Sequence, residues 1–118
     1  AEALCKERGF TLKLVEADEL TAALQPDVAV LMLTHVNYRT GAMLNMKAMT
    51  ASAHSVGALT VWDLAHSAGA VPVDLNDSQV QAVSYAGQIR PTTLRPKSRS
   101  SLVRQKLARR VRFCYAWR

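Results

Sequence analysis

An uninterrupted apolar segment, Val28 to Leu33, is the feature of this sequence that most restricts the fold. A strand with one face in water alternates apolar and polar residues, whereas this segment has no polar position. Such a pattern is typical of a strand that is covered on both faces, as in a parallel sheet flanked by helices. We therefore expect an α/β protein in which this segment is an inner strand.

A helix and a second strand follow at the spacing of a strand–helix–strand unit. Asn45 is a suitable N-cap residue, apolar and small residues then recur at helical spacing, and Gly57 ends the helix. Residues 58–62 are again apolar apart from one threonine. Strands joined by a helical crossover run parallel, so Thr34 and Asp63 leave the sheet at the same edge. If the two strands are adjacent, their ends lie about 5 Å apart.

The flanking segments predict shorter elements. Gly9 is a suitable helix stop, and Pro72 disfavours helix in the residue before it. The predicted elements are the end of a helix before Gly9, a strand over 10–15, a helix over 17–24, an extended segment over 71–75 and a weak strand over 80–85.

Charge divides the chain into two parts. Residues 1–77 contain nine acidic and five basic residues, whereas residues 78–118 contain ten basic residues and no acidic one. Arginine, lysine, serine and proline also become frequent after residue 87, which is typical of linkers and disordered segments. We expect a folded part over 1–77 and a basic tail over 78–118 that is irregular, or helical over 101–113.

Several classes of protein are disfavoured by the sequence. Cys5 and Cys114 stand far apart without metal-ligand spacing, which favours free thiols in a reducing compartment and no metal site. No apolar run approaches the ~20 residues of a membrane helix, and the first residues lack the pattern of a signal peptide. We expect a cytoplasmic protein without membrane association. Because the chain begins within a predicted helix, we interpret it as a fragment.

Asp63 directly follows an apolar strand, and His66 comes three residues later. A strand-end aspartate can simply cap the next turn, and the histidine can be an ordinary core or surface residue. However, open α/β sheets bind ligands at the carboxyl ends of their strands. A carboxylate there can pair with a cation such as the pyridinium nitrogen of pyridoxal phosphate, which keeps that ring protonated. His66 is placed to reach the same ligand.

Two motifs together resemble those of kynureninases, especially the bacterial enzymes. Leu33 begins the first, Leu-Thr-His-Val-Asn-Tyr-Arg-Thr-Gly, and Trp62 begins the second, Trp-Asp-Leu-Ala-His-Ser-Ala-Gly-Ala-Val-Pro-Val-Asp-Leu. The resemblance covers about residues 1–77. The related cysteine desulfurases and selenocysteine lyases share the strand-end aspartate, but they usually have glutamine at the position of His66. They are the alternative within the same fold type.

The resemblance implies part of the large domain of a fold-type I pyridoxal-phosphate enzyme, homodimeric, with active sites near the subunit interface. Its reaction would be the hydrolysis of L-kynurenine to anthranilate and L-alanine in tryptophan catabolism, a route toward NAD. By position, Asp63 would pair with the pyridine nitrogen of the cofactor. His66 and Thr34 would lie around the cofactor ring and its 3′ oxygen.

One departure from the kynureninase pattern concerns catalysis. The family has a Tyr-Lys pair about 25 residues after the aspartate, and this lysine holds the cofactor as a Schiff base. Here Tyr85 is followed by Ala86, and the first lysine after Asp63 is Lys97. The glycine-rich segment expected next is also missing, and the phosphate site would lie upstream of Ala1. We therefore expect no catalytic residue in this chain and no activity from it alone. A shift of reading frame would explain these changes, and an alternative frame of the coding DNA should then restore the Tyr-Lys pair.

The basic tail also suggests a function of another class. The ten basic residues lie within 90–118, with Tyr115 and Trp117 near the end, so the tail could contact phosphates while its aromatic rings stack on bases. The basic residues are scattered, however, and form no nucleic-acid-binding motif. A solvated tail without a nucleic-acid partner is therefore the favoured interpretation, and nucleic-acid binding is the alternative.

Overall fold

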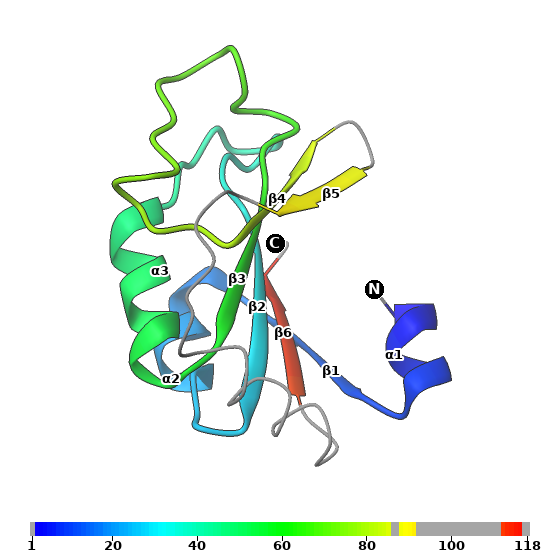
Figure 1. Ribbon diagram of the computed structural model, residues 1–118. Helices are drawn as coiled ribbons and strands as arrows, with labels where there is room; N and C mark the ends of the chain where they lie inside the picture. Colours follow the sequence, from blue (N-terminus) through cyan, green and yellow to red (C-terminus); the bar gives the residue numbers. More distant parts are fainter. Residues whose placement is uncertain (1, 86–87, 92–111, 117–118) are drawn as a thin grey trace.

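The computed structural model describes residues 2–85, 88–91 and 112–116. These residues contain six strands: β1 (Thr11–Val15), β2 (Val28–Thr34), β3 (Leu59–Asp63), β4 (Ala82–Tyr85), β5 (Gln88–Pro91) and β6 (Arg112–Ala116). They form one sheet in the order β1-β6-β2-β3-β4-β5 (Figure 1). All neighbours are parallel except β4 and β5. The predicted α/β class with a parallel sheet is confirmed.

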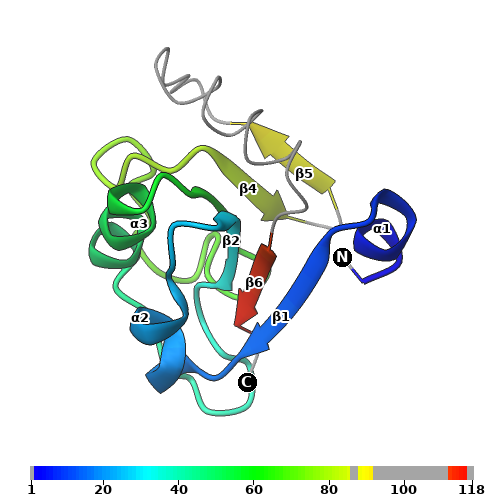
Figure 2. The same cartoon turned by 90° about the horizontal axis from the view of Figure 1, so that it is seen from below.

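The described helices lie to either side of this sheet. They are α1 (Glu2–Arg8), α2 (Leu20–Ala23) and α3 (Met46–Ser55), and a 3₁₀ turn, η1 (Ala17–Glu19), precedes α2. Helices α2 and α3 lie together on one side of β2 and β3, whereas α1 lies near the start of β1 (Figures 1 and 2). The single helix predicted over 17–24 is thus divided into a 3₁₀ turn and one α-helical turn.

The central strand–helix–strand unit forms as the sequence predicts. Asn45 caps α3, since its side chain accepts a hydrogen bond of 3.0 Å from the Ala48 backbone N–H. Gly57 follows the helix with φ of 75°, a conformation that glycine adopts without strain. Strands β2 and β3 are adjacent and parallel, and Thr34 is paired with Asp63 in their register.

The core lies between β2, β3 and the helices α2 and α3. Leu31 and Leu33 are fully buried on this side of β2, whereas Val30 and Met32, which alternate with them, are only half-buried. The prediction that this strand is covered on both faces therefore holds for one face. The reason is that α2 and α3 cover the same face of β2, whereas α1 lies beside β1, so the other face of β2 has no described helix over it.

Trp62 on β3 joins the sheet to α3. Its side chain is fully buried, and its indole Nε1–H donates a hydrogen bond of 3.0 Å to Thr50 Oγ1. Thr50 is itself fully buried on the inner face of α3. This pair sets the position of the helix against the strand that carries Asp63 at its end.

Strand β4 matches the weak strand predicted over 80–85, but two more strands, β5 and β6, lie within the region expected to be an irregular or helical tail, so the structure differs from that expectation. Strand β5 extends the sheet beyond β4, and β6 lies between β1 and β2 with parallel neighbours on both sides. The sequence from Phe113 to Ala116 is aromatic and apolar, which favours a strand despite the surrounding positive charge. Most of the helix predicted over 101–113 lies outside the described residues.

Candidate functional site

The ends of three strands meet at the carboxyl edge of the sheet. Thr34 and Asp63 are register partners on β2 and β3, and the His35 backbone N–H donates to the Asp63 carbonyl at 3.0 Å. On the other side of β3, the Leu64 N–H donates to the Ser84 carbonyl at 2.8 Å. The sequence-based expectation that Thr34 and Asp63 share one edge is therefore confirmed.

Asp63 caps the turn after β3, which was one of the two roles predicted for it. Its Oδ1 accepts a hydrogen bond of 3.0 Å from the Ala65 backbone N–H and so caps the turn after β3. The residue is half-buried, and within the described residues its other oxygen, Oδ2, accepts no hydrogen bond. One carboxylate oxygen therefore remains available for a cationic ligand.

Two hydroxyl groups near the ends of the same strands have no hydrogen-bond partner in the described part of the chain. Among the described residues, Thr34 Oγ1 and Ser67 Oγ are buried and make no hydrogen bond. Buried polar groups in proteins are nearly always hydrogen-bonded, and each exception requires an explanation. For Thr34, which lies beside Asp63 in the register, a polar group of a bound ligand would supply the missing partner.

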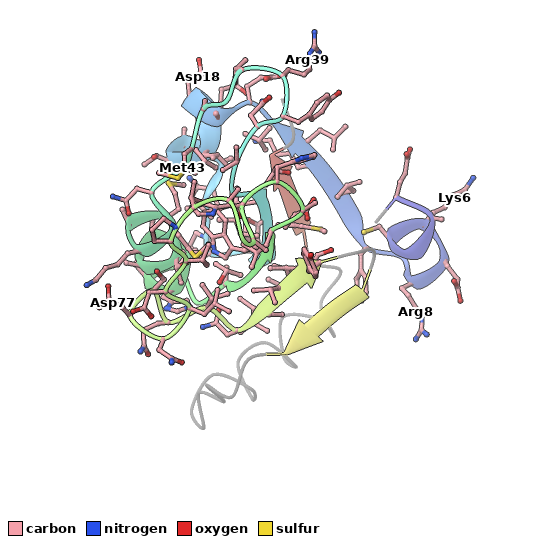
Figure 3. The ribbon with its side chains drawn as sticks, turned by 90° about the horizontal axis from the view of Figure 1, so that it is seen from above. Lys6, Arg8, Asp18, Arg39, Met43 and Asp77 are labelled. Carbon is pink, nitrogen blue, oxygen red and sulfur yellow. The ribbon has the colours of Figure 1, made fainter. Side chains whose placement is uncertain are left out.

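His66 lies in the loop after β3, and its ring contacts that of Tyr38 in the loop after β2. The ring centroids are 5.6 Å apart, and the ring planes are tilted by 34°. The structure thus brings His66 to the same side of the sheet as Thr34 and Asp63. The involvement of Tyr38 was not predicted, because no sequence pattern indicates a ring contact between two loops. The neighbouring Arg39 points outward from this loop (Figure 3).

His35 is the buried histidine at this edge. It is 5% exposed, and its ring packs edge-on against Trp62 with centroids 5.8 Å apart. Its Nδ1 has no hydrogen-bond partner among the described residues. Burial lowers the pKa of His35 below its usual value of 6.5, because the charged imidazolium loses its hydration there.

We expect the folded chain to lose stability as the pH falls below about 6.5, in part through His35. The unfolded state takes up a proton near the ordinary histidine pKa, whereas the folded state resists protonation because its His35 pKa is lowered. The stabilisation is therefore present above pH 6.5 and is lost as the pH falls. Urea unfolding between pH 7.5 and 5 should show a smaller decline for His35→Phe than for the wild type. An equal decline would contradict this role.

A pocket of about 340 Å³ adjoins this edge but is separate from the predicted site residues. It lies between the start of α3 and residues 72–78, and its lining includes His35, Leu44 and Val73. Thr34, Asp63 and His66 do not line it. In the described part of the chain, no group of three or more acidic, histidine or cysteine side chains is arranged to hold a metal ion. Nor does any helix there have the length and apolar character required to cross a membrane.

Sequence comparison relates most of this chain to known proteins. Residues 1–88 match the aminotransferase class-V family model. Kynureninase from Pseudomonas fluorescens is 59% identical over 73 residues, which are 61% of this chain and 18% of that protein. Kynureninase from Burkholderia mallei is 54% identical over 71 residues, or 59% of this chain and 17% of that protein.

Comparison with solved structures shows that the chain shares the fold of an aminotransferase. Alanine–glyoxylate aminotransferase from Nostoc sp. superimposes with a TM-score of 0.56 at 24% sequence identity, over 83% of this chain and 27% of that structure. The chain spans less than a fifth of the length of the kynureninases that it matches. Because the family model matches 88 of the 118 residues, the chain belongs to the aminotransferase class-V family.

Proposed function

We propose that this chain is part of a kynureninase, a pyridoxal-phosphate enzyme that hydrolyses L-kynurenine to anthranilate and L-alanine. The observation that carries the proposal is the register pairing of Thr34 with Asp63, at the edge of the sheet where the predicted cofactor residues meet. The similarity to two bacterial kynureninases supports this choice over cysteine desulfurases and selenocysteine lyases. In keeping with the family, we further propose a homodimeric, cytoplasmic enzyme of tryptophan catabolism.

The residues at this edge fit the proposed cofactor. Asp63 offers a half-buried carboxylate oxygen without a described partner, which suits a protonated pyridine nitrogen. Thr34 offers a buried hydroxyl without a described partner, which suits a polar ring substituent. His66 presents an imidazole on the same side. The donor set thus matches one planar cation that carries an oxygen substituent.

Each of these residues would have a distinct task. When bound, pyridoxal phosphate supplies an electron-withdrawing ring that stabilises negative charge on the substrate. Asp63 would keep the ring nitrogen protonated, because its negative charge favours the cationic form. Its Oδ1 holds the turn after β3, so the carboxylate is fixed in orientation before the ligand arrives. Thr34 would bind the ring oxygen, and His66 would lie against the ring.

The lysine that the family uses to hold the cofactor is not found at the expected distance in this chain, where Tyr85 is followed by Ala86. The first lysine after Asp63, Lys97, lies outside the described residues. We therefore propose that the chain binds the cofactor without a Schiff base and does not hydrolyse kynurenine by itself. A domain boundary near residue 77, after which the acidic residues end, is part of this proposal.

The test is a titration of the purified chain with pyridoxal phosphate, followed by NMR. We expect reversible binding that Asp63→Asn weakens by about tenfold, since the ion pair with the ring nitrogen is lost. Asparagine can still accept the hydrogen bond from the Ala65 N–H, so the turn should persist. Asp18→Asn is the matched control, because Asp18 is exposed on η1 (Figure 3).

Two results would contradict the proposal. The first is an equal affinity for pyridoxal phosphate in the wild type and in Asp63→Asn, which would remove Asp63 from the cofactor site. The second is a stoichiometric adduct on one lysine of this chain, trapped by borohydride and located by mass spectrometry, which would contradict binding without a Schiff base. Nucleic-acid binding by residues 90–118 stays a separate prediction, since residues 92–111 lie outside the described part of the chain.

A further inference from the structure

Two rings from different loops meet above the edge that carries Thr34 and Asp63. The Tyr38 and His66 centroids are 5.6 Å apart with a tilt of 34°, within the range of favourable aromatic contacts. Tyr38 is 61% exposed, so packing in the hydrophobic core is not what holds its ring in place. Its contact with His66 is therefore a feature of the site and not of the core.

The loop that carries Tyr38 is fixed by its own hydrogen bonds. Asn37 Oδ1 accepts hydrogen bonds from the backbone N–H groups of Arg39 at 2.9 Å and Thr40 at 3.2 Å. The Gly41 N–H donates to the Asn37 carbonyl at 2.8 Å. These hydrogen bonds join residues before and after Tyr38, so they hold its backbone. Its side chain extends toward the loop that carries His66.

The loop that carries His66 is fixed in the same way. Asp63 Oδ1 accepts from the Ala65 N–H at 3.0 Å, and the Leu64 carbonyl accepts from the Ala68 N–H at 2.9 Å. The His66 backbone is thus held, whereas its exposed side chain can rotate about the broad torsion that joins an imidazole to its Cβ. The Tyr38 ring is the described aromatic contact that restricts this rotation.

We propose that Tyr38 is a positioning residue that sets the plane of the His66 imidazole. One face of the His66 imidazole lies against Tyr38. The opposite face is then left for the planar ligand that pairs with Asp63. If the His66 side chain is already ordered, binding loses less side-chain entropy and the free-energy cost of binding is smaller. The identity of that ligand, a protonated pyridine ring, rests on the function proposed above, but the contact between Tyr38 and His66 does not.

The contact is tested in the ligand-free chain by NMR of the His66 ring protons, assigned with His66→Gln. In the wild type we expect a nuclear Overhauser effect between the two rings and an upfield shift of the His66 protons. Tyr38→Ala should abolish both signals, and Tyr38→Phe should retain them, because Phe keeps the ring and loses only the hydroxyl. A wild-type chain without the Overhauser effect, or Tyr38→Ala with unchanged His66 shifts, would overturn the proposal.

The effect on binding is tested with pyridoxal phosphate as the probe. Tyr38→Ala should weaken its affinity by roughly twofold to tenfold, the size of one aromatic contact, and Tyr38→Phe should restore the wild-type value. Equal affinity in the wild type and Tyr38→Ala would overturn the positioning role, as would equal losses in both variants. If the wild type binds no pyridoxal phosphate, the proposed function fails, and the ligand-free spectra alone decide whether Tyr38 positions His66.

Discussion

Replacing Trp62 with alanine should lower the free energy of unfolding by about 3–5 kcal/mol, the usual cost of emptying a buried tryptophan site. Trp62 is fully buried at the centre of the contact between β3 and α3. Small domains have a net stability of only about 5–15 kcal/mol, so this loss removes much of the total. Urea unfolding followed by circular dichroism measures the change directly.

Two milder variants separate the packing of Trp62 from its hydrogen bond. Trp62→Phe keeps most of the ring volume and loses the Nε1–H, whereas Thr50→Val keeps the shape of Thr50 and leaves that N–H buried without its acceptor. An unpaired buried donor costs about 1–3 kcal/mol. Because Trp62 and Thr50 are hydrogen-bond partners, the variant that combines Trp62→Phe and Thr50→Val should lose less stability than the sum of the losses in the two single variants. A loss below about 1 kcal/mol in Trp62→Ala would contradict the central place of this contact.

The strand–helix–strand unit was predictable because its signals are local. Val28 to Leu33 is apolar throughout, residues 58–62 are apolar apart from Thr60, Asn45 caps the helix between them, and Gly57 ends it. The crossover rule then places the ends of both strands at one edge without further information. For the same reason, the proximity of Thr34 and Asp63 followed from the sequence, as the register pairing confirms.

The ring contact above that edge was not predictable in the same way. Tyr38 meets His66 because Asn37 folds its own loop and Asp63 folds the other. Each turn is indicated by its sequence, but the direction in which two loops project is not. The buried Nδ1 of His35 likewise becomes apparent only once Trp62 is packed against that ring.

The position of β6 depends on pairing between distant parts of the chain. Strand β1 pairs with β6 and not with β2, so residues near both ends of the sequence become neighbours. The positive charge between residues 90 and 112 favoured a solvated tail, and no local pattern indicates which strands the last residues join. The apolar and aromatic character of 113–116 is compatible with a strand, but the prediction of an irregular tail or a helix over 101–113 did not use it.

Cys114→Pro should therefore destabilise the sheet by at least about 1–3 kcal/mol, the cost of leaving a ladder hydrogen bond unmade. Cys114 is paired with Lys13 on β1 and with Leu31 on β2, so β6 is an inner strand at this position. Proline has no N–H for the ladder and is tolerated in sheets almost only at edges and bulges. Urea unfolding gives the loss of stability, and hydrogen exchange of the β1 amides shows whether that strand is released.

Cys114→Val is the matched control, because valine keeps the backbone N–H, favours strands and removes the same thiol. It should retain the stability of the wild type and the protection of the β1 amides. With both variants in hand, a loss confined to Cys114→Pro shows that the backbone of β6 holds β1 to β2. If Cys114→Pro instead unfolds like the wild type, β6 does not support the sheet, and the solvated basic tail expected from the charge pattern is the better description.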